Sequence, residues 1–206
     1  MNLLREYIRE ILLTESARTP AELPDDTYVT IAGTPANVMM IFYSDKNGNQ
    51  KKRQAGAGDA EQSVIGRVDF NDRSESWRPD RDSCLQAYQV AHSHASHGWG
   101  PLLYDVAMEV AGSRGLTPDK TALSHDAYSV WSQYLDRGDV TKKQLDDTEN
   151  TLTGTPKDNC ETDSAENFAG MPMDKDDLLT SPVMKVYTKG PTTIQQLEKM
   201  EKLIRK

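Results

Sequence analysis

The first 15 residues place apolar and charged side chains at the spacing of an α-helix. Arg5, Glu6, Arg9 and Glu10 fall on one face, opposite the apolar positions. This pattern predicts an amphipathic helix over residues 1–15 whose apolar stripe comprises Leu3, Leu4, Tyr7, Ile8, Ile11 and Leu12. Because so short a helix is marginal in isolation, its stripe packs either on the rest of the chain or on another protein.

After a polar linker at 16–26, the pattern changes to short apolar runs bounded by turn residues. These runs predict β-strands at 27–33, 36–45, 63–70, 84–91 and 183–188. The second run ends in Asn47-Gly48, a dipeptide typical of hairpin turns.

Helical spacing returns in the second half of the chain. It predicts helices at 102–114 and 124–136, a shorter helix after Thr141, and a C-terminal helix over 193–206 in which Thr193 and Gln196 match a capping box. Strands followed by alternating helices and strands favour an α/β fold, a mixed sheet flanked by helices. We expect this domain to span residues 27–149, followed by an acidic irregular segment at 150–182 and a strand and helix at 183–206.

The composition narrows the classes of function. The chain has 206 residues and a net charge of −8. A negative net charge gives no electrostatic attraction for non-specific binding to nucleic acid. No apolar run approaches the roughly 18 residues of a membrane span. The two cysteines, Cys84 and Cys160, lie far apart and form no metal-binding or disulfide pattern.

The segment between the fourth strand and the next helix is rich in glycine. It reads His97-Gly98-Trp99-Gly100-Pro101, and a proline at the first helical position is pre-set for the helix. Glycine lets a ligand approach the main chain closely, and the free N–H groups of a helix start attract anions. We therefore expect a phosphate-accepting turn, with a tight connection as the alternative, around His97, Gly98, Trp99, Gly100 and Leu102.

These residues resemble the acetyl-CoA signature of the GNAT N-acetyltransferases, Gln/Arg-x-x-Gly-x-Gly/Ala between a strand and a helix. Both glycine positions match, whereas Ala95 replaces the usual Gln or Arg. The resemblance spans 84–137 and implies a GNAT-like, mostly antiparallel sheet with acetyl-CoA or another acyl-CoA as cofactor. It also implies an Asn-x-x-Ala…Tyr helix, for which this chain has Ser124 and Ala127. Trp131 falls near the position of the family's tyrosine acid, so Tyr128 or Tyr134 would take that role.

Three of the four histidines, His92, His94 and His97, lie just before the glycines. Residues two apart on a strand share a face, so His92 and His94 could converge on a metal. Under the acyltransferase interpretation, one of them instead acts as the base for the incoming amine. A solvated polar strand end is the third alternative. No carboxylate follows at the spacing of metallohydrolase motifs, so we expect no metal site.

The N-terminal helix resembles the head-targeting peptides of large tailed bacteriophages. Those peptides are removed by the prohead protease after Leu-x-Glu or Ile-x-Glu, and this chain reads Leu13-Thr14-Glu15 followed by Ser16. The stretch 84–137 also resembles phage proteins of undefined role. These resemblances imply location in the virion interior or host cytoplasm, with prohead scaffold or capsid proteins and the protease as partners.

Two functions from different classes follow. The first is a phage-encoded, GNAT-like protein that binds acyl-CoA and transfers the acyl group to an amine whose identity the sequence leaves open. The second is a non-catalytic internal head protein that kept the scaffold and lost the chemistry. A metal-dependent hydrolase that uses the histidines is a more remote third.

Overall fold

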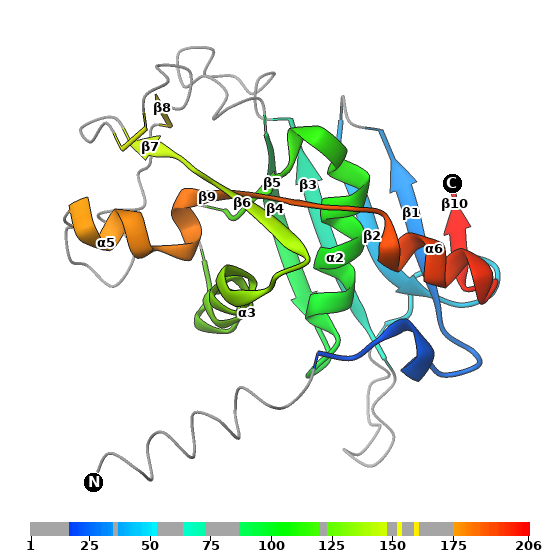
Figure 1. Ribbon diagram of the computed structural model, residues 1–206. Coiled ribbons are helices and arrows are strands. Elements are labelled where there is room, and N and C mark those ends of the chain that lie inside the picture. The colour runs from blue at the N-terminus through cyan, green and yellow to red at the C-terminus, as the bar shows by residue number, and fades with distance from the viewer. Residues whose placement is uncertain are drawn as a thin grey trace, which may run out of the picture.

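An eight-stranded sheet with the order β10-β1-β2-β3-β4-β5-β9-β6 organises the computed structural model of the chain (Figure 1). The structure describes residues 17–34, 37–52, 64–72, 87–119, 123–147, 152–153, 159–160 and 175–206. The helix expected at 1–15, with Leu13, Glu15 and Ser16 of the proposed cleavage site, lies outside the described residues. The mixed α/β class and the mostly antiparallel sheet are confirmed.

The first half of the sheet is an antiparallel run of four strands. These are β1 (Tyr28–Gly33), β2 (Met39–Ser44), β3 (Gly66–Asn71) and β4 (Tyr88–Ala95). The strands predicted at 27–33, 36–45 and 63–70 are confirmed. Their large apolar side chains, such as Ile41, Tyr43 and Phe70, are fully buried.

Strand β4 continues beyond the end predicted for it at residue 91. It runs to Ala95 because Ser93, His94 and Ala95 pair with Val68, Arg67 and Gly66 of β3. The register shifts between Asp69 and Phe70, which leaves an extra residue, Ala91, on β4. His92 and His94 therefore belong to a paired strand rather than to a loop.

The second half of the sheet contains one parallel pair. Strand β5 (Leu116–Thr117) runs parallel to β4, β9 (Lys185–Lys189) follows it antiparallel, and β6 (Val140–Gln144) forms the edge. The strand predicted at 183–188 is confirmed as β9. The short helix predicted after Thr141 is wrong, because residues 140–144 pair along the whole of β9. A further pair, β7 (Asp146–Asp147) and β8 (Asn159–Cys160), lies apart from the main sheet.

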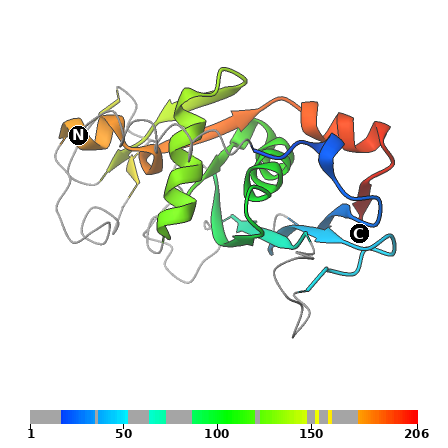
Figure 2. The same ribbon diagram turned by 90° about the horizontal axis from the view of Figure 1, so that it is seen from below.

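Three helices cover one face of the sheet, as Figure 2 shows: α2 (Gly100–Ala111), α3 (His125–Asp136) and α6 (Thr192–Lys199). Helix α2 is packed centrally and buries Leu103, Val106, Ala107 and Met108. It ends earlier than the predicted residue 114 and passes into the 3₁₀ turn η4 (Gly112–Arg114). Helix α3 matches its prediction, with Ser124 accepting a hydrogen bond from the Ala127 N–H as the cap.

The remaining helical elements are short. They are η1 (Pro20–Glu22) near the N-terminus, α5 (Lys175–Thr180) and η6 (Pro182–Met184). Within the 150–182 segment, α5 buries Leu178 in a small second core with Ala87, Leu145, Val183, Met184 and Val186. Part of the acidic segment is therefore ordered against the sheet.

The C-terminal helix is shorter than predicted. Helix α6 ends at Lys199, Glu201 takes a left-handed conformation (φ 56°), and the chain forms strand β10 (Leu203–Arg205) parallel to β1. The capping box predicted for Thr193 and Gln196 is absent from α6. The Glu109 carboxylate of α2 takes its place, because it accepts the N–H groups of Thr193 (2.8 Å) and Ile194 (2.7 Å).

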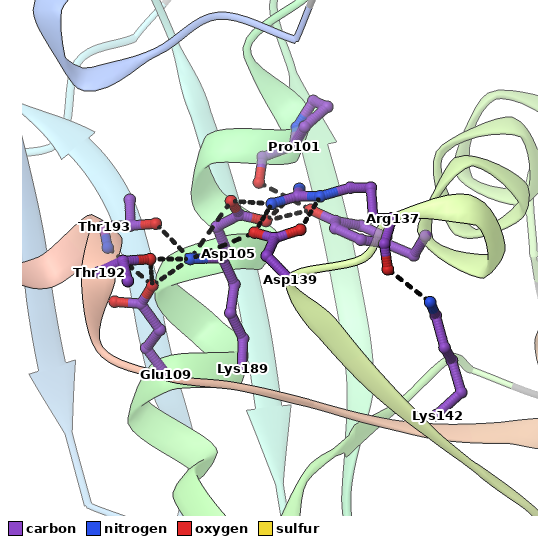
Figure 3. Close-up of polar contacts among 10 residues, drawn as sticks. Pro101, Asp105, Glu109, Arg137, Asp139, Lys142, Lys189, Thr192 and Thr193 are labelled. Carbon is purple, nitrogen blue, oxygen red and sulfur yellow. Dashed lines mark hydrogen bonds and ion pairs between the residues drawn. The ribbon is translucent and has the colours of Figure 1, made fainter.

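Glu109 belongs to a network of buried charges that joins α2 to the later elements (Figure 3). Its side chain is fully buried and pairs at 2.5 Å with Lys189, whose side chain is 3% exposed. Lys189 also donates to the hydroxyls of Thr192 (2.6 Å) and Thr193 (2.9 Å). One carboxylate thus fixes the end of β9 and the start of α6 on the same helix.

Substitution of Lys189 by Met tests this network. It leaves the Glu109 carboxylate buried without its cation, so we expect a loss of about 3–5 kcal/mol in the free energy of unfolding, measured by denaturant titration. Arg205→Met is the matched control, because Arg205 pairs with Glu198 at the surface and should cost less than about 1 kcal/mol. Equal losses in the two variants would contradict the role given to Glu109.

Candidate functional site

The face of the sheet opposite α2 carries a group of polar side chains on β3, β4 and β5. Strand pairing sets this face, because directly opposite residues share a side: Arg67 pairs with His94, Asp69 with His92, Asn71 with Gln89, and Gln89 with Thr117. We call this group the polar face; it consists of Arg67, Asp69, Asn71, Gln89, His92, His94 and Thr117. A sheet face away from the core is ordinarily solvated, yet Asp69 and Thr117 are buried here.

The two histidines of the polar face contact each other. His94 Nδ1 lies 3.3 Å from His92 Nε2, the ring centroids are 5.4 Å apart, and both residues are exposed. Partial burial, followed by the positive charges of His92 and Arg67, lowers the pKa of His94, whereas Asp69 opposes the shift. A lowered pKa favours the neutral imidazole, which is the form that can accept a proton.

Arg67 and Asp69 form a charged pair on β3, directly opposite His94 and His92 of β4. Arg67 Nε donates to Asp69 Oδ1 at 2.6 Å, and its other nitrogens contact Met40 Sδ (3.1 Å) and Gln50 Oε1 (3.5 Å). Among the described residues, no group of three or more His, Cys, Asp or Glu side chains lies close enough to hold a metal ion. The polar face thus offers bases and hydrogen-bonding groups.

Strands β4 and β5 pair only over Tyr88–Leu116 and Gln89–Thr117. Strand β4 continues to Ala95, whereas β5 ends at Thr117, so within the described chain the later part of β4 has no β5 partner. In α/β sheets, ligands bind beyond the carboxyl ends of parallel strands, where neighbouring connections part. The glycine turn and the start of α2 follow directly from this end of β4.

The glycine turn is only partly free to bind a ligand. Gly98 has φ 76°, a conformation that favours glycine. The Trp99 N–H donates to Ser96 O (3.0 Å), and the Trp99 carbonyl accepts the Tyr43 hydroxyl (2.8 Å). Trp99 itself is buried with its ring edge-on to Tyr43, and Pro101 has no N–H to offer. Within the described part of the chain, the N–H groups of Gly100 and Leu102 make no hydrogen bond outside the helix, so they are donors that an anion at the helix start can use.

An arginine from the N-terminal segment lies beside this turn. The Arg18 N–H donates to the Gly98 carbonyl (3.1 Å), and Arg18 Cγ and Nε lie 3.5 and 3.8 Å from where a Cβ on Gly98 would be. Its guanidinium pairs with Glu22 at 2.7 Å and is half exposed. His97 is also exposed in this turn. The start of α2 is thus flanked by an arginine from outside the signature, which is ion-paired with Glu22.

Tyr134 lies in the charge network rather than on the polar face. Its hydroxyl donates toward Asp105 Oδ1 (2.7 Å) and lies 2.9 Å from the Pro101 carbonyl. Burial, followed by the Asp105 carboxylate, raises the pKa of Tyr134 well above its usual range. Arg137 holds the same carboxylate with two hydrogen bonds (2.7 and 2.9 Å; Figure 3). Tyr134 therefore ties α3 to the first turn of α2.

The other two aromatic candidates of α3 lie in the hydrophobic cores. Tyr128 is half-buried and packs beside the second core, and Trp131 is fully buried among Tyr104, Tyr134 and Tyr187. Sequence reasoning missed Arg18, Arg67, Asp69, Asn71, Gln89 and Thr117. Alternation of polar residues in the GRVDFN strand was the one available signal for Arg67, Asp69 and Asn71.

Comparisons with known proteins returned nothing to set beside this geometry: no protein-family model, no curated protein and no solved structure matches the chain. In the described part of the chain, no helix has the length and apolar character needed to cross a membrane.

The depressed pKa of His94 is directly measurable. By NMR titration of the histidine ring signals, we expect a midpoint below the usual value of about 6.5, so that the associated stability is present above pH 6.5 and is lost as the pH falls through the folded midpoint. Arg67→Met removes one of the causes and should move the midpoint upward. The distant variant Arg205→Met should leave it unchanged. A midpoint above 6.5 in the unmodified protein would show that this description of the polar face is mistaken.

Proposed function

We propose that the protein is a GNAT-like acyl-CoA-binding protein that transfers the acyl group to an amine. One observation carries the proposal: a single strand, β4, leads to an anion-attracting helix start on one side of the sheet and carries a histidine pair on the other. The order of strand, glycine turn, helix, parallel strand and helix over β4, α2, β5 and α3 is also what the GNAT resemblance requires.

The diphosphate of the carrier is assigned to the start of α2. The N–H groups of Gly100 and Leu102 and the positive end of the helix dipole attract an anion there. The family's usual Gln or Arg is Ala95 in this chain, and we propose that Arg18 supplies the missing charge from the N-terminal segment. The thioester then passes the part of β4 that extends beyond its pairing with β5 and so reaches the polar face.

The chemistry is a direct attack. A neutral amine adds to the thioester carbonyl, the C–S bond breaks, and the amine's proton passes to His94, with His92 as its neighbour in the pair. The thiolate that leaves takes a proton from Tyr128 or from water. Tyr134 is replaced in this scheme, since its proton is directed to Asp105.

Calorimetric titration with acetyl-CoA tests the proposal. We expect saturable binding that is weakened about tenfold by Arg18→Gln, the loss of roughly one charge-assisted contact. Arg205→Gln is the control, because this arginine also pairs with an exposed glutamate but lies on β10. Absence of heat at millimolar acetyl-CoA in the unmodified protein would end the acyl-CoA proposal.

A second function is favoured because residues at or near the positions of the family's functional side chains have structural roles in this chain. Ser124 caps α3, and Tyr134 is committed to the charge network, which fits a non-catalytic internal head protein of a tailed phage. Cleavage after Leu13-Thr14-Glu15 would spare Arg18 and its hydrogen bond to the Gly98 carbonyl.

Mass spectrometry of purified phage particles tests this second function. We expect the protein inside the particle with Ser16 as its first residue, delivered by the N-terminal helix and trimmed by the prohead protease. Recovery with residues 1–15 intact would exclude cleavage. Absence of the protein from the particles would exclude the virion function.

A further inference from the structure

Three polar residues form one row across the polar face, one strand apart. Asn71 of β3 pairs with Gln89 of β4, and Gln89 pairs with Thr117 of β5. Asn71 and Gln89 are half-buried, and Thr117 is fully buried, with 1% of its surface exposed. Gln89 Nε2 reaches toward Asp119 Oδ1 at 3.5 Å.

Two oxygen atoms of this row are buried without a hydrogen bond. Asn71 Oδ1 and Thr117 Oγ1 have no partner in the described part of the chain, where the only other such atom is Trp131 Nε1. An unsatisfied buried polar atom costs about 1–3 kcal/mol, and folded proteins contain few of them. Two in a single row point to a missing partner that donates hydrogen bonds.

The acceptor groups near the row favour a partner that donates hydrogen bonds. Asp119 accepts from Gln89, the middle residue of the row. Asp69, on the same face of β3, is paired with Arg67, so these two side chains together add no net charge. An ammonium group would satisfy acceptor oxygens in this setting, whereas an anion would be repelled.

The row lies at a fixed distance from the histidine pair. His92 and His94 pair with Asp69 and Arg67, which lie two and four positions from Asn71 along β3, or about 7 and 13 Å. A linear diamine with about six carbon atoms between its nitrogens reaches a distance between these two values.

We propose that the row of Asn71, Gln89 and Thr117 binds the distal ammonium of a linear diamine whose other nitrogen lies at His92 and His94. The assignment of that second nitrogen as the acyl acceptor rests on the proposed function. The binding site itself does not, because the row and its orphaned oxygens are present whether or not acyl-CoA binds.

Thermal unfolding in the presence of 1,6-diaminohexane tests the site, with hexylamine as the ligand that lacks the distal ammonium. A ligand that binds the folded state raises Tm with its concentration. We expect diaminohexane to raise Tm more than hexylamine does. Thr117→Val keeps the side-chain shape and removes the hydroxyl, and should weaken the apparent affinity for diaminohexane about tenfold.

Thr141→Val is the matched control, because Thr141 faces the same side from the edge strand β6 but is exposed and lies outside the row. It should respond to diaminohexane like the unmodified protein. Identical responses of all three proteins would overturn the site, since they indicate only general attraction of diamines to an acidic chain. Equal shifts in Tm with hexylamine and diaminohexane would overturn it as well.

The result is separable from the acetyl-CoA titration. Row-dependent diamine binding without acetyl-CoA binding would leave the site standing and remove the acyltransferase. Acetyl-CoA binding without row-dependent diamine binding would remove the diamine site and leave the acyl-CoA proposal standing.

Discussion

The buried carboxylates of α2 are the constraint on which the arrangement of the later chain depends. A carboxylate in the interior must be paired and hydrogen-bonded. Asp105 is satisfied by Arg137 at the end of α3 and by the Tyr134 hydroxyl, and Glu109 by Lys189 of β9 and two N–H groups of α6. Two side chains one turn apart on α2 therefore hold three elements that follow it in the sequence, namely α3, β9 and α6.

This anchoring has a consequence for function. Because α2 is held by α3, by α6 and by strands of the sheet that include β9, its first turn has a fixed position relative to the end of β4. Preorganisation of that kind lets main-chain donors bind an anion without ordering costs. The histidine pair lies on the opposite face of the same strand, so a ligand that contacts both must pass where β4 has no β5 partner.

Much of the fold could be predicted, because the signals for β1 to β3 and α3 lie within each segment. They are the apolar runs bounded by turn residues for the strands, and the helical spacing and the Ser124 cap for α3. The errors arose where pairing overrode local pattern: the polar HSHA segment joins β4 through β3, and Lys142 and Lys143 fit an edge strand. The C-terminal helix stopped at Lys199 because Glu201 turns the chain toward β1. The glycine turn and histidines were visible as motifs, but Arg18 and the row at Asn71 and Thr117 are brought together only by tertiary structure.

A crystal structure of the protein with acetyl-CoA tests the central claim most directly. We expect the diphosphate within hydrogen-bonding distance of the Gly100 and Leu102 nitrogens and the Arg18 guanidinium turned toward it. We expect the thioester beside the part of β4 that extends beyond its pairing with β5. A carrier bound elsewhere, or a first turn of α2 closed off by residues 17–23 with no ligand present, would contradict it.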